Sequence, residues 1–130
     1  MTLRKLFGSR SADGVSAERM AEKYLLGKGL KLIARNYRCR FGEIDLIMLH
    51  GDVTVFVEVR LRQSRGGVGS SNDYGGAAAS IGPHKQARII AAAQHYLAGM
   101  KESPPCRFDA VLLNQLSEAQ LEWMRDAFSA

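Results

Sequence analysis

The stretch of sequence that decides the fold is residues 43–62, which read EIDLIMLHGDVTVFVEVRLR. Two runs of mostly aliphatic and β-branched residues flank Gly51 and Asp52, a Gly-X pair that suits a two-residue type II′ turn. The segment therefore predicts a β-hairpin in which His50 pairs with Val53. This register fixes the partner of every other residue in the two strands.

The register assigns the side chains of the hairpin to two faces. One face is apolar apart from His50 and is expected to belong to the core. It pairs Ile44 with Val59, Leu46 with Val57, and Met48 with Val55. The other face pairs Glu43 with Arg60, Asp45 with Glu58, Ile47 with Phe56, and Leu49 with Thr54. On this second face two carboxylates therefore lie directly opposite each other.

The opposed carboxylates of Asp45 and Glu58 indicate a candidate site. Cross-strand neighbours lie about 5 Å apart at Cβ, so two carboxylates there repel each other unless a cation or a proton lies between them. A hard divalent ion such as Mg²⁺ fits this arrangement, because it binds one or two carboxylates and keeps several waters for a phosphate substrate. The residues alone leave open a second interpretation, a salt-bridged surface in which Arg60 and Arg62 neutralise both acids.

Further elements are expected on either side of the hairpin. Apolar periodicity and chain breakers predict a helix over 16–27 with Ser16 as its N-cap, a strand over 31–39, a second helix over 84–98 after Pro83, and a strand over 107–113. The tail over 117–128 fits a helix through Leu121, Met124 and Phe128, and equally a strand through Leu121, Trp123 and Arg125. The glycine-rich segment 62–82 is expected to be a mobile loop, and residues 1–14 a flexible N-terminus.

Two glutamates of the first helix differ in their expected position. Glu18 lies at the edge of the apolar stripe, whereas Glu22 points further outward. If this helix packs on the polar face of the hairpin, Glu18 approaches Asp45 and Glu58. Periodicity by itself favours an exposed helix glutamate at this position.

The composition is that of one globular domain over residues 1–130. Hydrophobic residues make up 46% and charged residues 24% of the chain, which excludes a disordered protein, and no apolar run approaches the roughly 18 residues of a membrane span. Because the N-terminal apolar stretch is too short for a signal peptide, we expect a cytoplasmic protein. Two cysteines, Cys39 and Cys106, form neither a disulfide framework nor a zinc site.

Positive charge is concentrated in the first two thirds of the chain. Residues 1–88 hold 15 basic and 8 acidic side chains, a net charge of +7, compared with a formal +5 for the whole chain. Arginine binds phosphate bidentately and stays charged, so a nucleic acid is the expected partner, although an ordinary solvated basic surface has the same composition. The candidate nucleic-acid contacts are Arg35, Arg38, Arg62, Arg65, Lys85 and Arg88.

Several segments resemble one known family in their order along the chain. They are Glu18-x-x-Ala21-x-x-Tyr24-Leu25, Arg35-Asn36-Tyr37-Arg38, Gly42-Glu43-Ile44-Asp45-Leu46-Ile47, Phe56-Val57-Glu58-Val59-Arg60, Lys85, Arg107-Phe108-Asp109 and Asp126-Ala127-Phe128. Together they resemble the YraN-like family of small uncharacterised bacterial proteins, which is related to archaeal Holliday junction resolvases. Its wider relatives are the PD-(D/E)xK nucleases.

The resemblance implies a fold and a set of site residues. The fold is a restriction-endonuclease-like α/β core, a mixed central β-sheet flanked by helices. Asp45 and Glu58 would bind Mg²⁺ or Mn²⁺, with the carbonyl of Val59 as a third ligand and Glu18 as a nearby helix carboxylate. The implied chemistry is hydrolysis of a phosphodiester by metal-activated water, in which Arg60 completes the catalytic set.

One position departs from the nuclease pattern. Related nucleases place Lys where this sequence has Arg60, and arginine cannot lose its proton at working pH, so this residue is excluded as a general base. Asp109 is singled out by the resemblance alone, and a structural role is expected for it. The predicted function is therefore a metal-dependent endonuclease-like protein that acts on branched or damaged DNA.

Other functions remain open on the sequence. The chief alternative is a non-catalytic nucleic-acid-binding module on a nuclease scaffold, and a third is a protein-interaction domain. DNA is the expected partner and no membrane is expected. A homodimer follows by fold analogy with resolvases that act on two-fold-symmetric junctions.

Overall fold

Five strands form one mixed sheet in the computed structural model, which describes residues 12–62 and 81–130. The elements in chain order are α2 (Ala12–Gly27), β1 (Lys31–Cys39), β2 (Gly42–His50), β3 (Val53–Arg62), α4 (Pro83–Ala98), β4 (Cys106–Asn114), η2 (Glu118–Gln120) and β5 (Leu121–Phe128). The strand order is β1-β2-β3-β4-β5, with β3 and β4 parallel and the other neighbours antiparallel. This mixed α/β architecture confirms the predicted fold class and is consistent with a restriction-endonuclease-like core.

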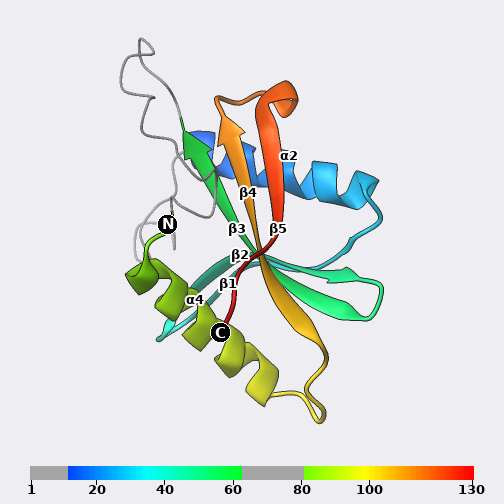
Figure 1. Cartoon of the computed structure of the whole chain (residues 1–130), viewed down its shortest axis with the longest axis vertical. Coiled ribbons are helices and arrows are strands. Elements are labelled where there is room, and N and C mark those ends of the chain that lie inside the picture. The colour runs from blue at the N-terminus through cyan, green and yellow to red at the C-terminus, as the bar shows by residue number, and fades with distance from the viewer. Residues whose placement is uncertain (1–11, 63–80) are drawn as a thin grey trace, which may run out of the picture.

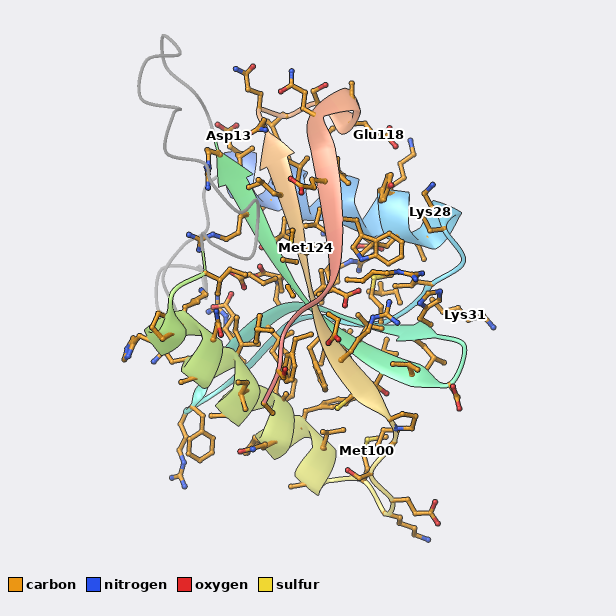
Figure 2. The ribbon with its side chains drawn as sticks, viewed as in Figure 1. Asp13, Lys28, Lys31, Met100, Glu118 and Met124 are labelled. Carbon is orange, nitrogen blue, oxygen red and sulfur yellow. The ribbon has the colours of Figure 1, made fainter. Side chains whose placement is uncertain are left out.

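Each face of the sheet packs against one helix within the described residues (Figure 1). The cluster under α4 contains Phe56, Phe108 and Phe128, whose rings stack at centroid distances of 5.4 and 5.0 Å. The cluster under α2 contains Leu46 and Val57 of the hairpin. Figure 2 shows side chains filling the space between α4 and the sheet. Neither described helix is long and apolar enough to cross a membrane.

The central hairpin has the predicted register from its turn as far as Leu46 and Val57. The pairs run from His50↔Val53 through Leu49↔Thr54, Met48↔Val55 and Ile47↔Phe56 to Leu46↔Val57. Gly51 has a φ of 65°, and Asp52 is not among the residues with positive φ, as a type II′ turn requires. The local turn chemistry was therefore sufficient to specify this part of the sheet.

One prediction about the hairpin is wrong. Ile44 was expected to share a face with Leu46 and to pair with Val59. Instead Ile44 belongs to the cluster under α4, together with Ile47, whereas Leu46 and Val59 pack in or against the cluster under α2. Because side chains alternate along a regular strand, β2 must turn over at Asp45, between Ile44 and Leu46.

The neighbouring strand explains this reversal. In β1, Asn36 has a φ of 52°, a left-handed conformation that asparagine tolerates better than most residues. It lies between Arg35, which pairs with Leu46, and Tyr37, which pairs with Ile44. Both strands therefore change the face they present at the same level of the sheet.

Several predicted boundaries also need correction. The first helix begins at Ala12, so Ser16 lies inside it and is not its N-cap, and residues 12–14 are helical. Arg62 ends β3, and Ile81 is buried in the core, so the expected mobile segment 62–82 is too long at both ends; residues 63–80, like 1–11, lie outside the described residues. The tail is a strand, β5, which follows the short η2 turn.

An ion pair joins α2 to β1. Glu22 was expected to point outward, but it is buried and accepts hydrogen bonds from Arg35 Nε at 2.7 Å and Arg35 Nη2 at 2.9 Å. These bonds lower the pKa of Glu22 below its usual range although burial acts in the opposite direction. Arg35, expected to contact nucleic acid, is therefore engaged within the fold.

A buried carboxylate holds the last two strands together. Asp109 in β4 is fully buried and accepts two hydrogen bonds from Arg107, one from Trp123 Nε1 at 2.9 Å, and one from the main-chain N–H of Asp126 at 2.9 Å. Asp126 has a φ of 54° at an irregularity of β5. Every one of these contacts is internal, as expected of a structural residue.

Replacing Asp109 by Asn is expected to lower the free energy of unfolding by about 3 kcal/mol, because the Arg107 guanidinium loses its buried counter-charge. Urea unfolding followed by circular dichroism measures the change. The control is Asp126→Asn, which keeps the main-chain donor and suits the positive φ, and whose effect should stay within about 0.5 kcal/mol. Equal losses in the two variants would contradict this role of Asp109.

Candidate active site

The candidate site lies where β2 and β3 stop pairing. The last residues that pair are Leu46 and Val57. At the next residue of β2, the side chain of Asp45 contacts β3 in place of the main chain. Asp45 Oδ2 accepts a hydrogen bond from the main-chain N–H of Val59 at 2.8 Å. A side-chain carboxylate thus occupies the place of a main-chain acceptor, and the N–H dipole stabilises its negative charge.

The second carboxylate lies beside the first in a dry environment. The exposed fractions are 8% for Asp45 and 4% for Glu58. Burial, the charge of Asp45 and a side-chain hydrogen bond with Asp45 raise the pKa of Glu58 to about 8, although Lys85 and Arg60 act in the opposite direction. Near neutral pH the pair therefore holds a proton, which a bound cation could replace.

Two cations border Glu58 on the more exposed side of the site. Lys85 Nζ, in the first turn of α4, and Arg60 Nη1, in β3, each lie 3.6 Å from Glu58 Oε2. Their side chains are 44% and 38% exposed, compared with 4% for Glu58. The site therefore has a buried acidic part and an exposed basic part, and the basic part can meet an anion from solvent.

Glu18, the helix carboxylate expected near the metal, has a partner outside the Asp45–Glu58 pair. Glu18 Oε1 accepts a hydrogen bond from Asn36 Nδ2 at 3.0 Å. Among the described residues, no group of three or more His, Cys, Asp or Glu side chains is arranged to hold a metal ion, so Glu18 does not complete such a group with Asp45 and Glu58. The side-chain donors present are two buried carboxylates, the type and number that Mg²⁺ or Mn²⁺ binds while retaining waters.

The other described arginines that were predicted to contact nucleic acid lie on different elements. Arg38 Nε lies 3.6 Å from Glu43 Oε1, and the two residues are paired between β1 and β2. The expected partner of Glu43 was Arg60. Arg88 is exposed on α4, and Arg62 is half-buried at the end of β3. Arg65 lies outside the described residues.

Two features of the site were missed by the sequence reasoning. The contact of Lys85 with Glu58 depends on how α4 packs against the sheet, which no local pattern shows. Asn36, the partner of Glu18, stands in the middle of a strand, and asparagine is depleted in strands, so its position was a usable signal.

Comparison with known proteins places the chain in a family. A model of the uncharacterised protein family UPF0102 matches residues 17–113, a range that contains Asp45, Glu58 and Lys85. The chain belongs to the UPF0102 family. Membership of the YraN-like family, predicted from the segments above, is thereby confirmed. The matched range ends before β5, so the resemblance noted for residues 126–128 lies outside it.

Individual UPF0102 proteins resemble this chain over nearly its full length. One from Nitrosomonas europaea is 53% identical over 120 residues, which cover 92% of this chain and 96% of its own. One from Methylobacillus flagellatus is 52% identical over 117 residues, covering 90% and 96%. One from Psychromonas ingrahamii is 44% identical over 128 residues, covering 98% of both chains.

The raised pKa of Glu58 predicts how stability depends on pH. Unfolded Glu58 ionises near its ordinary pKa of 4.5, whereas the folded chain keeps the proton up to about pH 8. Between these values the folded state binds more protons, so the free energy of unfolding should fall as pH rises, by at most about 1.4 kcal/mol per pH unit. Glu58→Gln, which mimics the protonated form, should remove this slope and be more stable than the natural chain at pH 8.

Urea unfolding at pH 5, 6, 7 and 8 tests this prediction. Glu43→Gln is the matched control, because Glu43 is partly exposed and pairs with Arg38 outside the buried pair. Its slope should equal that of the natural chain. Identical slopes in Glu58→Gln and the natural chain would show that Glu58 does not retain its proton on folding.

Gly42 sets the distance between α4 and the sheet. A Cβ at this position would lie 2.5 Å from the main-chain oxygen of Arg88, closer than packed atoms approach. Gly42→Ala should therefore displace α4, which carries Lys85, and lower the free energy of unfolding by about 1–3 kcal/mol. Thermal unfolding measures this, with Gly27→Ala as the control, since nothing lies within 4 Å of the added Cβ there. A Gly42→Ala protein as stable as the control would contradict the close packing.

Proposed function

We propose that this UPF0102 protein is a metal-dependent nuclease of the PD-(D/E)xK type that binds DNA and hydrolyses phosphodiester bonds in branched or damaged DNA. The observation that carries the proposal is the buried Asp45–Glu58 pair, with Lys85 and Arg60 both 3.6 Å from Glu58. Buried acids bind a divalent cation, and exposed basic groups beside them bind the phosphate that the cation also contacts.

Each residue of the proposed site has a separate role. Asp45 and Glu58 hold Mg²⁺ or Mn²⁺, with the Val59 carbonyl as a third ligand by resemblance to the nuclease family. When bound, the ion supplies Lewis acidity and a water activated for attack on phosphorus. Lys85 and Arg60 bind phosphate oxygens and offset the negative charge that develops in the transition state. Arg60 stays protonated and takes no part as a base.

The proton on Glu58 competes with the metal. Because a carboxylate must be ionised to bind a cation, Glu58 has to release its proton on binding. With its pKa raised to about 8, this release is costly at pH 6 and nearly free above pH 8. Metal affinity should therefore rise with pH over this interval.

Binding of the DNA backbone falls to the exposed basic residues around the site. Arg88 is exposed on the same helix as Lys85, and the pair of Arg38 with Glu43 is partly exposed, so a phosphate can replace Glu43 at small cost. Arg62 and, on the sequence alone, Arg65 belong to the same proposed set. Arg35 is left out, because Glu22 engages it. The homodimer expected by analogy stays a prediction.

A second function is favoured by one observation. Arg60 replaces the lysine of related nucleases and, with Lys85, already contacts Glu58, so two cations partly neutralise the acid that should bind the metal. This arrangement favours a non-catalytic nucleic-acid-binding module on a nuclease scaffold. Such a module binds DNA with steep salt dependence and without a divalent ion.

Nuclease activity is tested by incubating the purified protein with flap, junction and single-stranded DNA in Mg²⁺ or Mn²⁺. Asp45→Asn and Glu58→Gln should each lower the cleavage rate at least about 100-fold, because each removes a ligand of the ion. Glu43→Gln, which changes a carboxylate outside the pair, should cleave at the natural rate. Calorimetry with Mn²⁺ at pH 7, in buffers of different ionisation enthalpy, should show release of nearly one proton.

The outcomes separate the two functions. Cleavage that survives both substitutions would assign the activity to another site or to a contaminant. Salt-dependent DNA binding with neither cleavage nor Mn²⁺ binding would establish the non-catalytic module. Absence of binding to any nucleic acid or divalent ion would leave the protein-interaction domain.

A further inference from the structure

An exposed aromatic ring stands at the turn between β1 and β2. Of the five large hydrophobic side chains that are exposed in the described part of the chain, Phe41 alone is aromatic, and it is 42% exposed. Cys39 pairs with Gly42, so Arg40 and Phe41 form a two-residue turn. Such turns favour glycine, asparagine or aspartate, and neither residue here has a positive φ. Turn geometry therefore does not account for an arginine and a phenylalanine at these positions.

Two polar side chains contact the ring. The Arg40 guanidinium lies over it, with Cζ 5.1 Å from the ring centroid, and the ring of His95 on α4 lies 5.6 Å away at 55°. His95 is held in turn by Tyr37, whose hydroxyl lies 2.6 Å from His95 Nδ1. Phe41 is thus supported from α4 by a side chain with a fixed partner, while much of the ring remains open to solvent.

The contact with Arg40 is easily exchanged for a base. An exposed cation–π contact corresponds to about 2- to 5-fold in an equilibrium constant, whereas stacking one nucleobase on an aromatic side chain corresponds to about 5- to 150-fold. A base can therefore displace the guanidinium from the ring. Arg40 is exposed and, once displaced, is free to contact the phosphate of the same nucleotide.

This turn is joined to the candidate site by two rigid elements. Phe41 precedes Asp45 by four residues of mostly extended chain, about 13 Å. On the other side, α4 runs from Lys85 to His95, about 15 Å, and contacts the start of β2 where Gly42 meets Arg88. At about 3.4 Å per stacked nucleotide, these distances correspond to about four nucleotides.

We propose that the Arg40–Phe41 turn is a stacking site for an unpaired base, which lies about four nucleotides from the phosphate held by Lys85 and Arg60. The inference rests on the proposed function and names its substrate class: DNA with a single-stranded segment or an unpaired base next to the cleaved bond. A paired base inside a duplex has both faces stacked already and cannot stack on the ring.

The test compares binding to a 12-nucleotide single strand that carries 2-aminopurine with binding to the blunt duplex of the same sequence, in EDTA so that no cleavage occurs. The natural chain should quench 2-aminopurine fluorescence on the single strand. Phe41→Ala should lose this quenching and weaken single-strand binding about 5- to 150-fold while duplex binding stays unchanged. Phe41→Tyr, which keeps a ring, should behave as the natural chain.

Leu26→Ala is the matched control, since Leu26 is 45% exposed on α2, and it should leave both affinities unchanged. If the alanine variant fails to fold, Phe41→Leu keeps the apolar bulk without the ring and should show the same loss. Unchanged single-strand affinity and quenching in these Phe41 variants would overturn the inference, as would an equal loss on both DNAs. If the stacking site is overturned in this way but the protein cleaves DNA in Mn²⁺, the proposed function still stands. If the natural chain binds neither the single strand nor the duplex, both the stacking site and the proposed function are refuted.

Discussion

Two neighbouring buried carboxylates, one of which keeps its proton near neutral pH, govern the centre of this structure. Asp45 and Glu58 lie beside each other where the pairing of β2 with β3 ends, just beyond the last pair, Leu46↔Val57. The Val59 N–H stabilises one acid, a proton neutralises the other, and Lys85 and Arg60 offset part of the remaining charge. The close packing of α4 on the sheet serves this arrangement, because it brings the lysine to the pair.

Much of the fold followed from local patterns. The Gly51-Asp52 turn specified the pairing of β2 with β3, and apolar periodicity located both described helices to within a few residues. What could not be predicted is the reversal of faces at Asp45, because it depends on the left-handed conformation of Asn36 in another strand. The prediction that Glu22 points outward was wrong for a similar reason. Its burial depends on Arg35, which contacts it from β1.

The candidate site could be predicted only in part. Asp45 and Glu58 belong to the two strands of one hairpin, so their proximity could be predicted from the sequence, although regular pairing of the strands ends one residue before them. Lys85 was predicted to contact nucleic acid, but its proximity to Glu58 results from a crossover through α4 to a parallel strand, which no spacing in the sequence encodes. The same limit applies to residues 117–128. Their sequence fits a helix or a strand, and pairing with β4 stabilises the strand.

The parallel pairing of β3 with β4 also affects how the chain reaches its folded state. The β1–β2, β2–β3 and β4–β5 contacts join segments close in sequence, whereas Glu58 and its neighbour Ala110 are about 50 residues apart. Pairings over such separations form late, since the entropy of closing the intervening chain is lost before they stabilise anything. We therefore expect the local hairpins to form before α4 docks, so that a partly folded chain would bring the two acids together without the lysine that accompanies them in the folded state.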